Sequence, residues 1–133
     1  MITEEYVSFE TAKLLKEKGF DAKCFDFYEV EYEEVKHKHA QRSLPVDWNG
    51  EEDENCYSCP TQQMAMRWLR EEKHYYIQIM LDGWALGSHS GYYIVIQATD
   101  SDFKELNPVD KVFFETHEQA TEAAIKYCLD NLI

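Results

Sequence analysis

The spacing of apolar residues near the C-terminus most constrains the fold of this 133-residue chain. Apolar residues recur there at positions i, i+3, i+4, i+7 and i+8, which is the stripe of an amphipathic helix. Thr116 and Gln119 occupy the two positions of a capping box just before that stripe. The stripe consists of Ala120, Ala123, Ala124, Tyr127 and Cys128. The chain is therefore predicted to end in a helix that turns one face toward a core.

Two earlier segments also have helical spacing. In the first, Ser8 can cap the start of a helix. Gly19 followed by Phe20 is typical of a Schellman ending, in which Phe20 folds back toward Leu15. In the second, Thr61 is a favourable cap for a helix with an apolar stripe. That stripe consists of Met64, Ala65, Trp68 and Leu69.

Period-two alternation predicts strands over residues 23–32 and 75–81. The apolar run at 92–98 predicts a central strand, and a short strand over 111–114 follows a turn-rich stretch. In the first of these strands Glu29 and Glu31 share one face, opposite the face of Tyr28, Val30 and Tyr32. The predicted order is α-β-α-β-β-β-α. Short connections favour an antiparallel sheet of three to four strands with the helices packed on one face. The predicted fold class is α+β.

The stretch from about residue 33 to residue 60 lacks a clear period. It is polar, contains Pro45 and Asn49-Gly50, and includes the acidic run at 51–54. Such a composition predicts a long acidic loop. The chain has neither an internal repeat nor a Pro- or Ser-rich linker, so the simplest prediction is a single domain over 1–133.

The formal net charge of −13 comes from 26 acidic and 13 basic residues. Direct nucleic-acid binding is not expected, because proteins that bind phosphate backbones cluster Lys and Arg. The charge either keeps the protein soluble or forms a surface for a basic partner. More than half of the acidic residues precede Cys56. An outward ladder of Glu29, Glu31 and Glu33 beside the acidic run at 51–54 would imitate a row of phosphates. One hypothesis is therefore an acidic nucleic-acid mimic that binds a basic host protein, and the alternative is a solvated strand face.

No apolar run approaches the ~20 residues that a membrane-spanning helix needs. The acidic N-terminus does not resemble a secretory signal. A cytoplasmic location without membrane association is therefore expected. In that compartment the four cysteines, Cys24, Cys56, Cys59 and Cys128, are expected to be free thiols or metal ligands rather than disulfides.

Three segments carry a resemblance to known sequences. They are ITEEYVSFE at 2–10, PTQQMAMRWLRE at 60–71 and EAAIKYCL at 122–129. Together they resemble a group of small uncharacterised proteins from gut Bacteroides genomes and from related phages or integrated elements. The resemblance implies a soluble α+β protein of phage or mobile-element origin. It implies no established activity and no site residues.

The metal candidate in the sequence combines a CxxC pair with an upstream HxH pair. Thiolates from Cys56 and Cys59 and imidazoles from His37 and His39 would complete a tetrahedral Cys2His2 zinc site. In the alternative interpretation, Cys59 only precedes Pro60 at a helix entrance, and the two histidines are surface residues of a charged segment. Zinc is the one cofactor that the sequence suggests.

The loop between the strands at 75–81 and 92–98 contains Trp84 and the run Ser88-His89-Ser90. A serine nucleophile with His89 as its base is not favoured, because adjacent residues point apart and no GxSxG elbow is present. An exposed aromatic at a loop tip suits contact with a partner.

The leading hypothesis is a non-enzymatic protein-interaction module, an accessory protein of a mobile element. The expected partner is an unidentified protein, and association into a homo-oligomer is an alternative. The candidate partner-binding residues are Glu29, Glu31, Glu33, Trp84 and His89.

Overall fold

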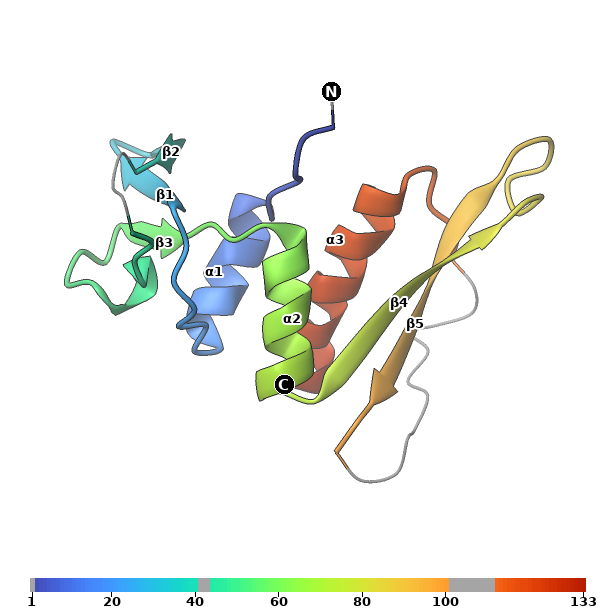
Figure 1. The fold of residues 1–133 in the computed structure, drawn as a ribbon. Coiled ribbons are helices and arrows are strands. Elements are labelled where there is room, and N and C mark those ends of the chain that lie inside the picture. The colour runs from blue at the N-terminus through green and yellow to red at the C-terminus, as the bar shows by residue number, and fades with distance from the viewer. Residues whose placement is uncertain (1, 41–43, 101–111) are drawn as a thin grey trace. The chain divides into compact units, whose positions relative to one another are not determined.

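The computed structural model describes residues 2–40, 44–100 and 112–133. In these residues the chain forms an α+β fold with antiparallel sheets, as predicted (Figure 1). The elements are α1 (Phe9–Glu17), β1 (Asp26–Glu31), β2 (Glu34–His39), the 3-10 helix η1 (Trp48–Gly50), β3 (Cys56–Ser58), α2 (Gln62–Glu72), β4 (Tyr75–Asp82), β5 (Gly91–Ala98), α3 (His117–Tyr127) and the π-helical turn η2 (Cys128–Leu132). Among the described helices, none has the length and apolar character that crossing a membrane requires.

The chain divides into two compact units, Met1–Ala65 and Met66–Ile133, and their border falls inside α2. Unit 1 contains α1, η1 and a three-stranded sheet of order β2-β1-β3. Unit 2 contains the two-stranded sheet β4-β5 and α3. The described strands therefore form two sheets where a single one was predicted, because β1 finds both of its partners within unit 1. A single domain over 1–133 stays a prediction.

The ends of α1 are as predicted. The Ser8 side chain accepts a hydrogen bond from Thr11 N at 3.3 Å. At the other end Gly19 N donates to Lys16 O at 3.2 Å and Phe20 N donates to Leu15 O at 2.9 Å. This pair of bonds is the Schellman motif, and it requires the left-handed φ of 89° at Gly19.

Replacing Gly19 by alanine is expected to lower the free energy of unfolding by about 1–2 kcal/mol. A Cβ added at Gly19 meets no atom within 4 Å, so the cost comes from the left-handed backbone rather than from a clash. Urea denaturation measures the change. Gly83→Ala is the matched control, because its added Cβ also meets nothing and its φ is not left-handed. Equal effects of the two substitutions would contradict this account of Gly19.

The predicted N-terminal caps of the other two helices are also confirmed. Thr61 Oγ1 accepts from Met64 N at 3.2 Å at the start of α2. At α3 both bonds of the capping box form between Thr116 and Gln119. Of the predicted stripe, Ala120, Ala124 and Cys128 are fully buried, whereas Ala123 and Tyr127 are half-buried.

Residues 33–60, predicted as a long loop, contain β2, η1 and β3. β1 and β2 form a hairpin in which Asp26 pairs with His39 and Glu31 pairs with Glu34. The turn consists of Tyr32 and Glu33, both with positive φ. Pattern reading missed β2 because this strand lies at the sheet edge and is mostly exposed, so it needs few apolar residues. The backbone hydrogen bonds to β1 hold β2 in its extended conformation.

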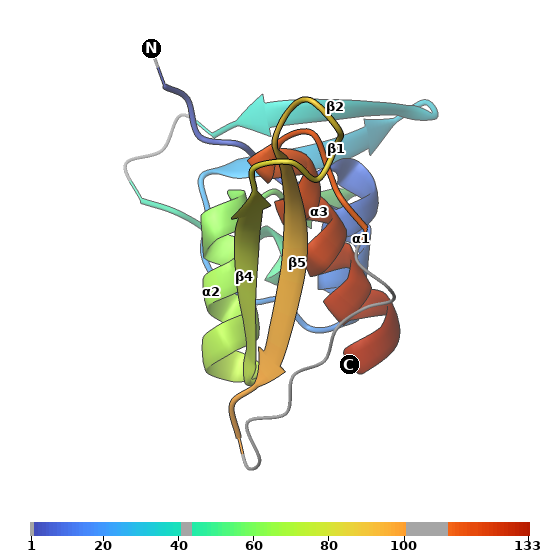
Figure 2. The same ribbon diagram turned by 90° about the vertical axis from the view of Figure 1, so that its right-hand side faces the viewer.

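In unit 2, β4 and β5 pair antiparallel without a bulge from Tyr75 opposite Ala98 to Asp82 opposite Gly91. Figure 2 shows the two strands side by side, and α3 packs against both. Ile96 on the α3 side is fully buried. Phe114 forms a single bridge to Tyr92, while Lys111, the start of the strand predicted at 111–114, lies outside the described residues.

Candidate functional site

The period-two alternation of the unit 1 sheet sorts its polar residues onto two faces. Asp26 pairs directly with His39, and Tyr28 pairs with His37, so these side chains share one face. Glu29 pairs with Lys36 and with Cys56, which places those residues on the other face. The two faces carry two separate clusters of titratable side chains.

The first cluster is centred on the buried carboxylate of Asp26. Its Oδ2 lies 2.6 Å from His37 Nε2, and its Oδ1 lies 2.5 Å from His39 Nδ1. Because a carboxylate only accepts hydrogen bonds, both ring nitrogens donate to it. Both histidines are partly exposed, whereas the Asp26 side chain is 6% exposed. The two imidazoles therefore shield a buried negative charge from solvent.

Cys59 and Tyr6 border this cluster. Cys59 Sγ lies 3.8 Å from His37 Nε2, the same nitrogen that donates to Asp26. That nitrogen has no free lone pair with which to accept the thiol proton, and Cys59 is fully buried. Burial, followed by the nearby charge of Asp26, raises the pKa of Tyr6. The arrangement lacks the geometry of a cysteine nucleophile with a histidine base.

The second cluster consists of Glu29, Asp53 and Cys56. Cys56 Sγ lies 3.5 Å from Asp53 Oδ2 and 3.8 Å from Glu29 Oε2. In the described residues this is the one group of three metal-ligand types whose atoms all lie within 4.8 Å of one another. Burial, the hydrogen bond to Asp53 and the two carboxylate charges raise the pKa of Cys56 to about 11. Thiolate and carboxylates are ligands that zinc accepts.

The four residues predicted as a Cys2His2 set are divided between the two clusters. His37, His39 and Cys59 lie around Asp26, whereas Cys56 lies with Glu29 and Asp53. The cause is the spacing, because residues three apart on an extended chain point to opposite faces. CxxC therefore brings both thiols to one point only when the chain turns between them.

Sequence reasoning missed Asp26, Asp53 and the role of Glu29 beside a thiol. Asp26 carried a usable signal, since it shares the alternation of Tyr28 and Val30 and so falls on an inward face. A carboxylate on an inward face needs hydrogen-bond donors. The sequence around Asp53 contained no such signal, because the position of Asp53 beside Cys56 depends on how the chain turns before β3.

The predicted acidic ladder is partly neutralised. Glu29 Oε1 lies 2.9 Å from Lys38 Nζ, and Glu31 Oε2 lies 3.5 Å from Lys36 Nζ. Glu33 lies apart from both, in the turn of the β1–β2 hairpin. These pairs leave the ladder with less net charge than a row of phosphates.

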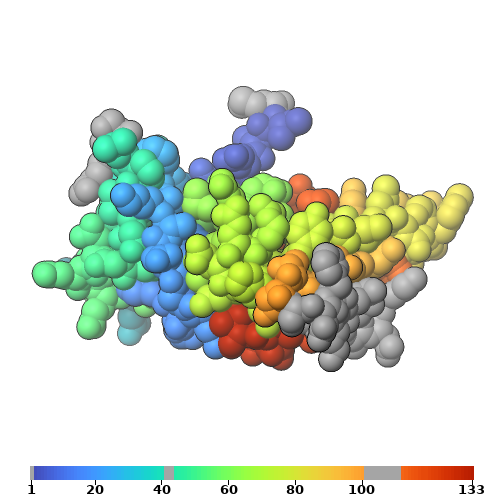
Figure 3. Space-filling view, turned by 60° about the horizontal axis from the view of Figure 1, so that its bottom comes forward, coloured from blue at the N-terminus to red at the C-terminus, as the bar shows by residue number. Residues whose placement is uncertain are grey.

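The tip of the β4–β5 hairpin, residues 83–90, presents Trp84 with 76% of its surface exposed. Trp84 N donates to Asp82 Oδ1 at 3.0 Å, and Gly87 N donates to Trp84 O at 3.3 Å. In the space-filling view of Figure 3 the yellow tip forms one end of unit 2. His89 is exposed there, and in this described loop no hydrogen bond joins its ring to Ser88 or Ser90. The tip therefore presents side chains for contact and carries no assembled nucleophile.

Comparison of the chain with protein-family models, with curated proteins and with solved structures finds no significant match.

Proposed function

We propose that the protein is a non-enzymatic interaction module that contacts a protein partner through the tip of its β4–β5 hairpin. The observation that carries the proposal is the 76% exposure of Trp84, while Trp48 and Trp68 are buried. Tryptophan is the side chain most enriched among interface residues that dominate binding energy. We place the module, in line with its sequence resemblance, among the cytoplasmic accessory proteins of mobile elements.

The tip presents Trp84 on a backbone already held by local hydrogen bonds. The bonds from Trp84 N to Asp82 and from Gly87 N to Trp84 O set the turn before any partner arrives. Preorganisation of this kind reduces the entropy lost on binding. Asp82 is the one charged residue (Asp, Glu, Lys or Arg) between Tyr75 and Ala98. The expected partner surface is therefore an apolar pocket rather than a basic groove.

A photoreactive phenylalanine placed at position 84 tests the proposal in the cells that naturally express the protein. We expect a crosslinked protein that is absent when the same probe replaces Tyr32, which is 100% exposed in the β1–β2 turn. The identified partner should bind the Trp84→Ser variant about 30-fold or more weakly, as for a typical hot spot. Crosslinks that are the same from both positions, or unchanged affinity of Trp84→Ser, would contradict the proposal.

The Trp84→Ser variant should keep its fold. The side chain is mostly exposed, so we expect the free energy of unfolding to change by less than about 0.5 kcal/mol. A circular dichroism melt that matches that of the natural protein would show that lost binding reflects the lost indole.

A second candidate function is zinc binding, favoured by the convergence of Glu29, Asp53 and Cys56. We expect the protein dialysed against Zn²⁺ to retain about one equivalent, measured by mass spectrometry of the metal. Cys56→Ser should abolish retention, because the thiolate is the strongest ligand of the three. Cys59→Ser is the matched control and should retain the metal. Loss of zinc in Cys59→Ser as well would favour the Cys2His2 set predicted from the sequence. No retained zinc in the natural protein would reject both zinc sites.

A further inference from the structure

β4 has one edge without a backbone partner among the described residues. In the described part of unit 2 the sheet consists of β4 and β5 (Figure 2). Tyr92 uses its outward N–H and C=O to pair with Phe114 on the far side of β5. Leu81 is opposite Tyr92, so its own N–H and C=O point away from β5. By the same alternation the backbone groups of Tyr75, Ile77 and Ile79 also point outward.

The described residues of β4 lack the features within a strand that usually prevent its pairing with another chain. β4 is eight residues long, contains no proline or lysine, and pairs with β5 without a bulge. The sheet of unit 1 differs in this respect. Its edge strand β2 carries Lys36 and Lys38, and its other edge strand β3 has only three residues. An unprotected β4 edge is therefore a specific feature of unit 2.

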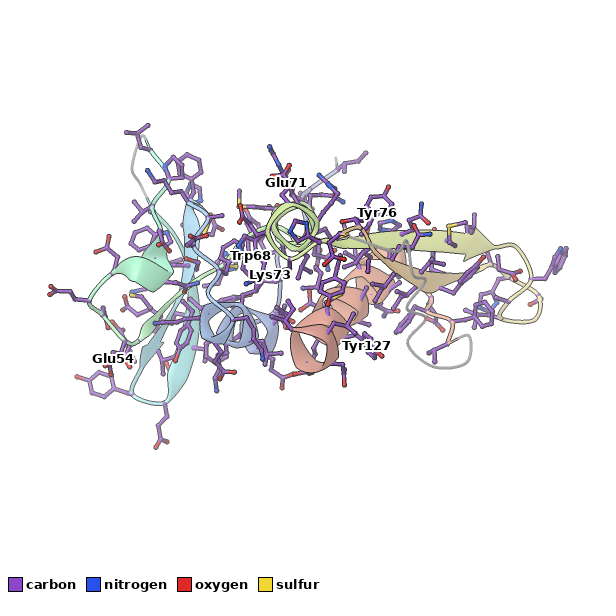
Figure 4. All side chains as sticks on the ribbon, turned by 90° about the horizontal axis from the view of Figure 1, so that it is seen from below. Glu54, Trp68, Glu71, Lys73, Tyr76 and Tyr127 are labelled. Carbon is purple, nitrogen blue, oxygen red and sulfur yellow. The ribbon has the colours of Figure 1, made fainter. Side chains whose placement is uncertain are left out.

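Because the chain is strongly acidic, the nearly uncharged β4–β5 hairpin is the favoured surface for association of two copies. A net charge of −13 opposes association of identical chains over most surfaces. From Tyr75 to Ala98 the one Asp, Glu, Lys or Arg is Asp82. Tyr76 and Met80 are exposed on the outer face of β4, and Figure 4 shows Tyr76 on the face opposite α3. Two copies approaching along β4 thus bury apolar and amide side chains without like-charge repulsion.

We propose that β4 pairs antiparallel with β4 of a second copy of this chain, with the two-fold axis at Gln78. In this register Ile77 lies opposite Ile79 of the second copy, and Tyr75 lies opposite Leu81. All the outward N–H and C=O groups of both strands are then paired. Asp82 then lies opposite His74 of the second copy, next to Lys73.

A second copy fits this edge because an antiparallel strand pair is self-complementary under a two-fold axis. The result is a continuous four-stranded antiparallel sheet with β5 at each edge. The dimer uses the strand edge, whereas the proposed binding function uses Trp84 at the hairpin tip. The two proposals are therefore independent, and each can fail without the other.

Sedimentation equilibrium of the full chain tests the proposal. We expect a mass of twice 15.8 kDa at micromolar concentrations. Gln78→Lys places two ammonium groups opposite each other at the axis and should weaken the dimer by about tenfold or more. Gln97→Lys is the matched control, because it makes the same change on the same face but on β5, and it should dimerise normally. A monomeric natural protein, or equal effects of the two substitutions, would overturn the proposal.

A cysteine crosslink tests the register. In the proposed register Gln78 lies opposite Gln78 of the second copy, in a pair without backbone hydrogen bonds between the two residues. The Cα atoms of such a pair are about 4.5 Å apart, which is within the range of a disulfide. Gln78→Cys should therefore form a disulfide dimer under mild oxidation. The four natural cysteines are buried and give little background. Gln97→Cys should stay uncrosslinked at the same protein concentration. Failure of Gln78→Cys to crosslink in a protein that does dimerise would reject this register and with it the proposed β4 pairing.

Discussion

Replacing Phe20 by alanine is expected to lower the free energy of unfolding by about 3–5 kcal/mol. Phe20 is 1% exposed and is the largest fully buried side chain of the described residues. It follows the Schellman ending of α1, and its carbonyl accepts from Asn49 Nδ2 at 3.0 Å. The substitution keeps both backbone bonds and removes the ring, so the loss reports burial and the cavity left behind. Urea denaturation followed by far-ultraviolet circular dichroism measures it.

Phe25→Ala is the matched control for this prediction. Phe25 precedes β1 in the same unit and is 40% exposed. Its truncation removes less buried surface and leaves no closed cavity, so we expect a loss of about 1 kcal/mol or less. A comparable loss in both variants would show that the ring of Phe20 is not a principal core element.

Above about pH 9 the protein is expected to lose stability by about 1.4 kcal/mol per pH unit through Cys128 alone. Burial raises the pKa of Cys128 from its ordinary value of 9.0 to about 12. Below pH 9 the thiol is protonated in both states, and its contribution to stability is fully present. Above pH 9 the unfolded chain releases the proton while the folded chain retains it, which favours unfolding until the pH reaches the folded pKa.

The Cys128→Ala variant isolates this contribution. Tyrosine and lysine residues titrate in the same range, but they are common to the natural protein and the variant. The difference in unfolding free energy between the two proteins should therefore shrink as the pH rises from 9 to 11 in urea titrations under reducing conditions. Cys24→Ala should behave similarly, because burial raises the pKa of Cys24 to about 11. Parallel pH profiles of the natural protein and Cys128→Ala would contradict the prediction.

Local chemistry made the helices and the β4–β5 hairpin predictable. Caps at Ser8, Thr61 and Thr116 depend on hydrogen bonds within a few residues, so the sequence alone reveals them. The same holds for the left-handed glycine at the end of α1. β4 was recognisable from its period-two alternation, and β5 from a continuous apolar run. Both strands pack on α3.

The first half of the chain was harder to predict because its order depends on pairing. β2 is an exposed edge strand with charged and imidazole side chains, so it lacks an apolar pattern. The turn before it uses Tyr32 and Glu33 at positive φ, where Asn-Gly would have marked a hairpin. Without that hairpin the register of Asp26 opposite His39 could not be inferred.

What the sequence by itself determined is the α+β class, the three helices with their caps, and the residue types from which sites can form. These depend on local propensity and periodicity. Only the tertiary structure decided how the sites divide. It placed His37, His39 and Cys59 around Asp26 and gave Cys56 to the opposite face with Glu29 and Asp53. The physical reason is strand register, since a shift of one residue exchanges the faces, and register is set by partners distant in the chain.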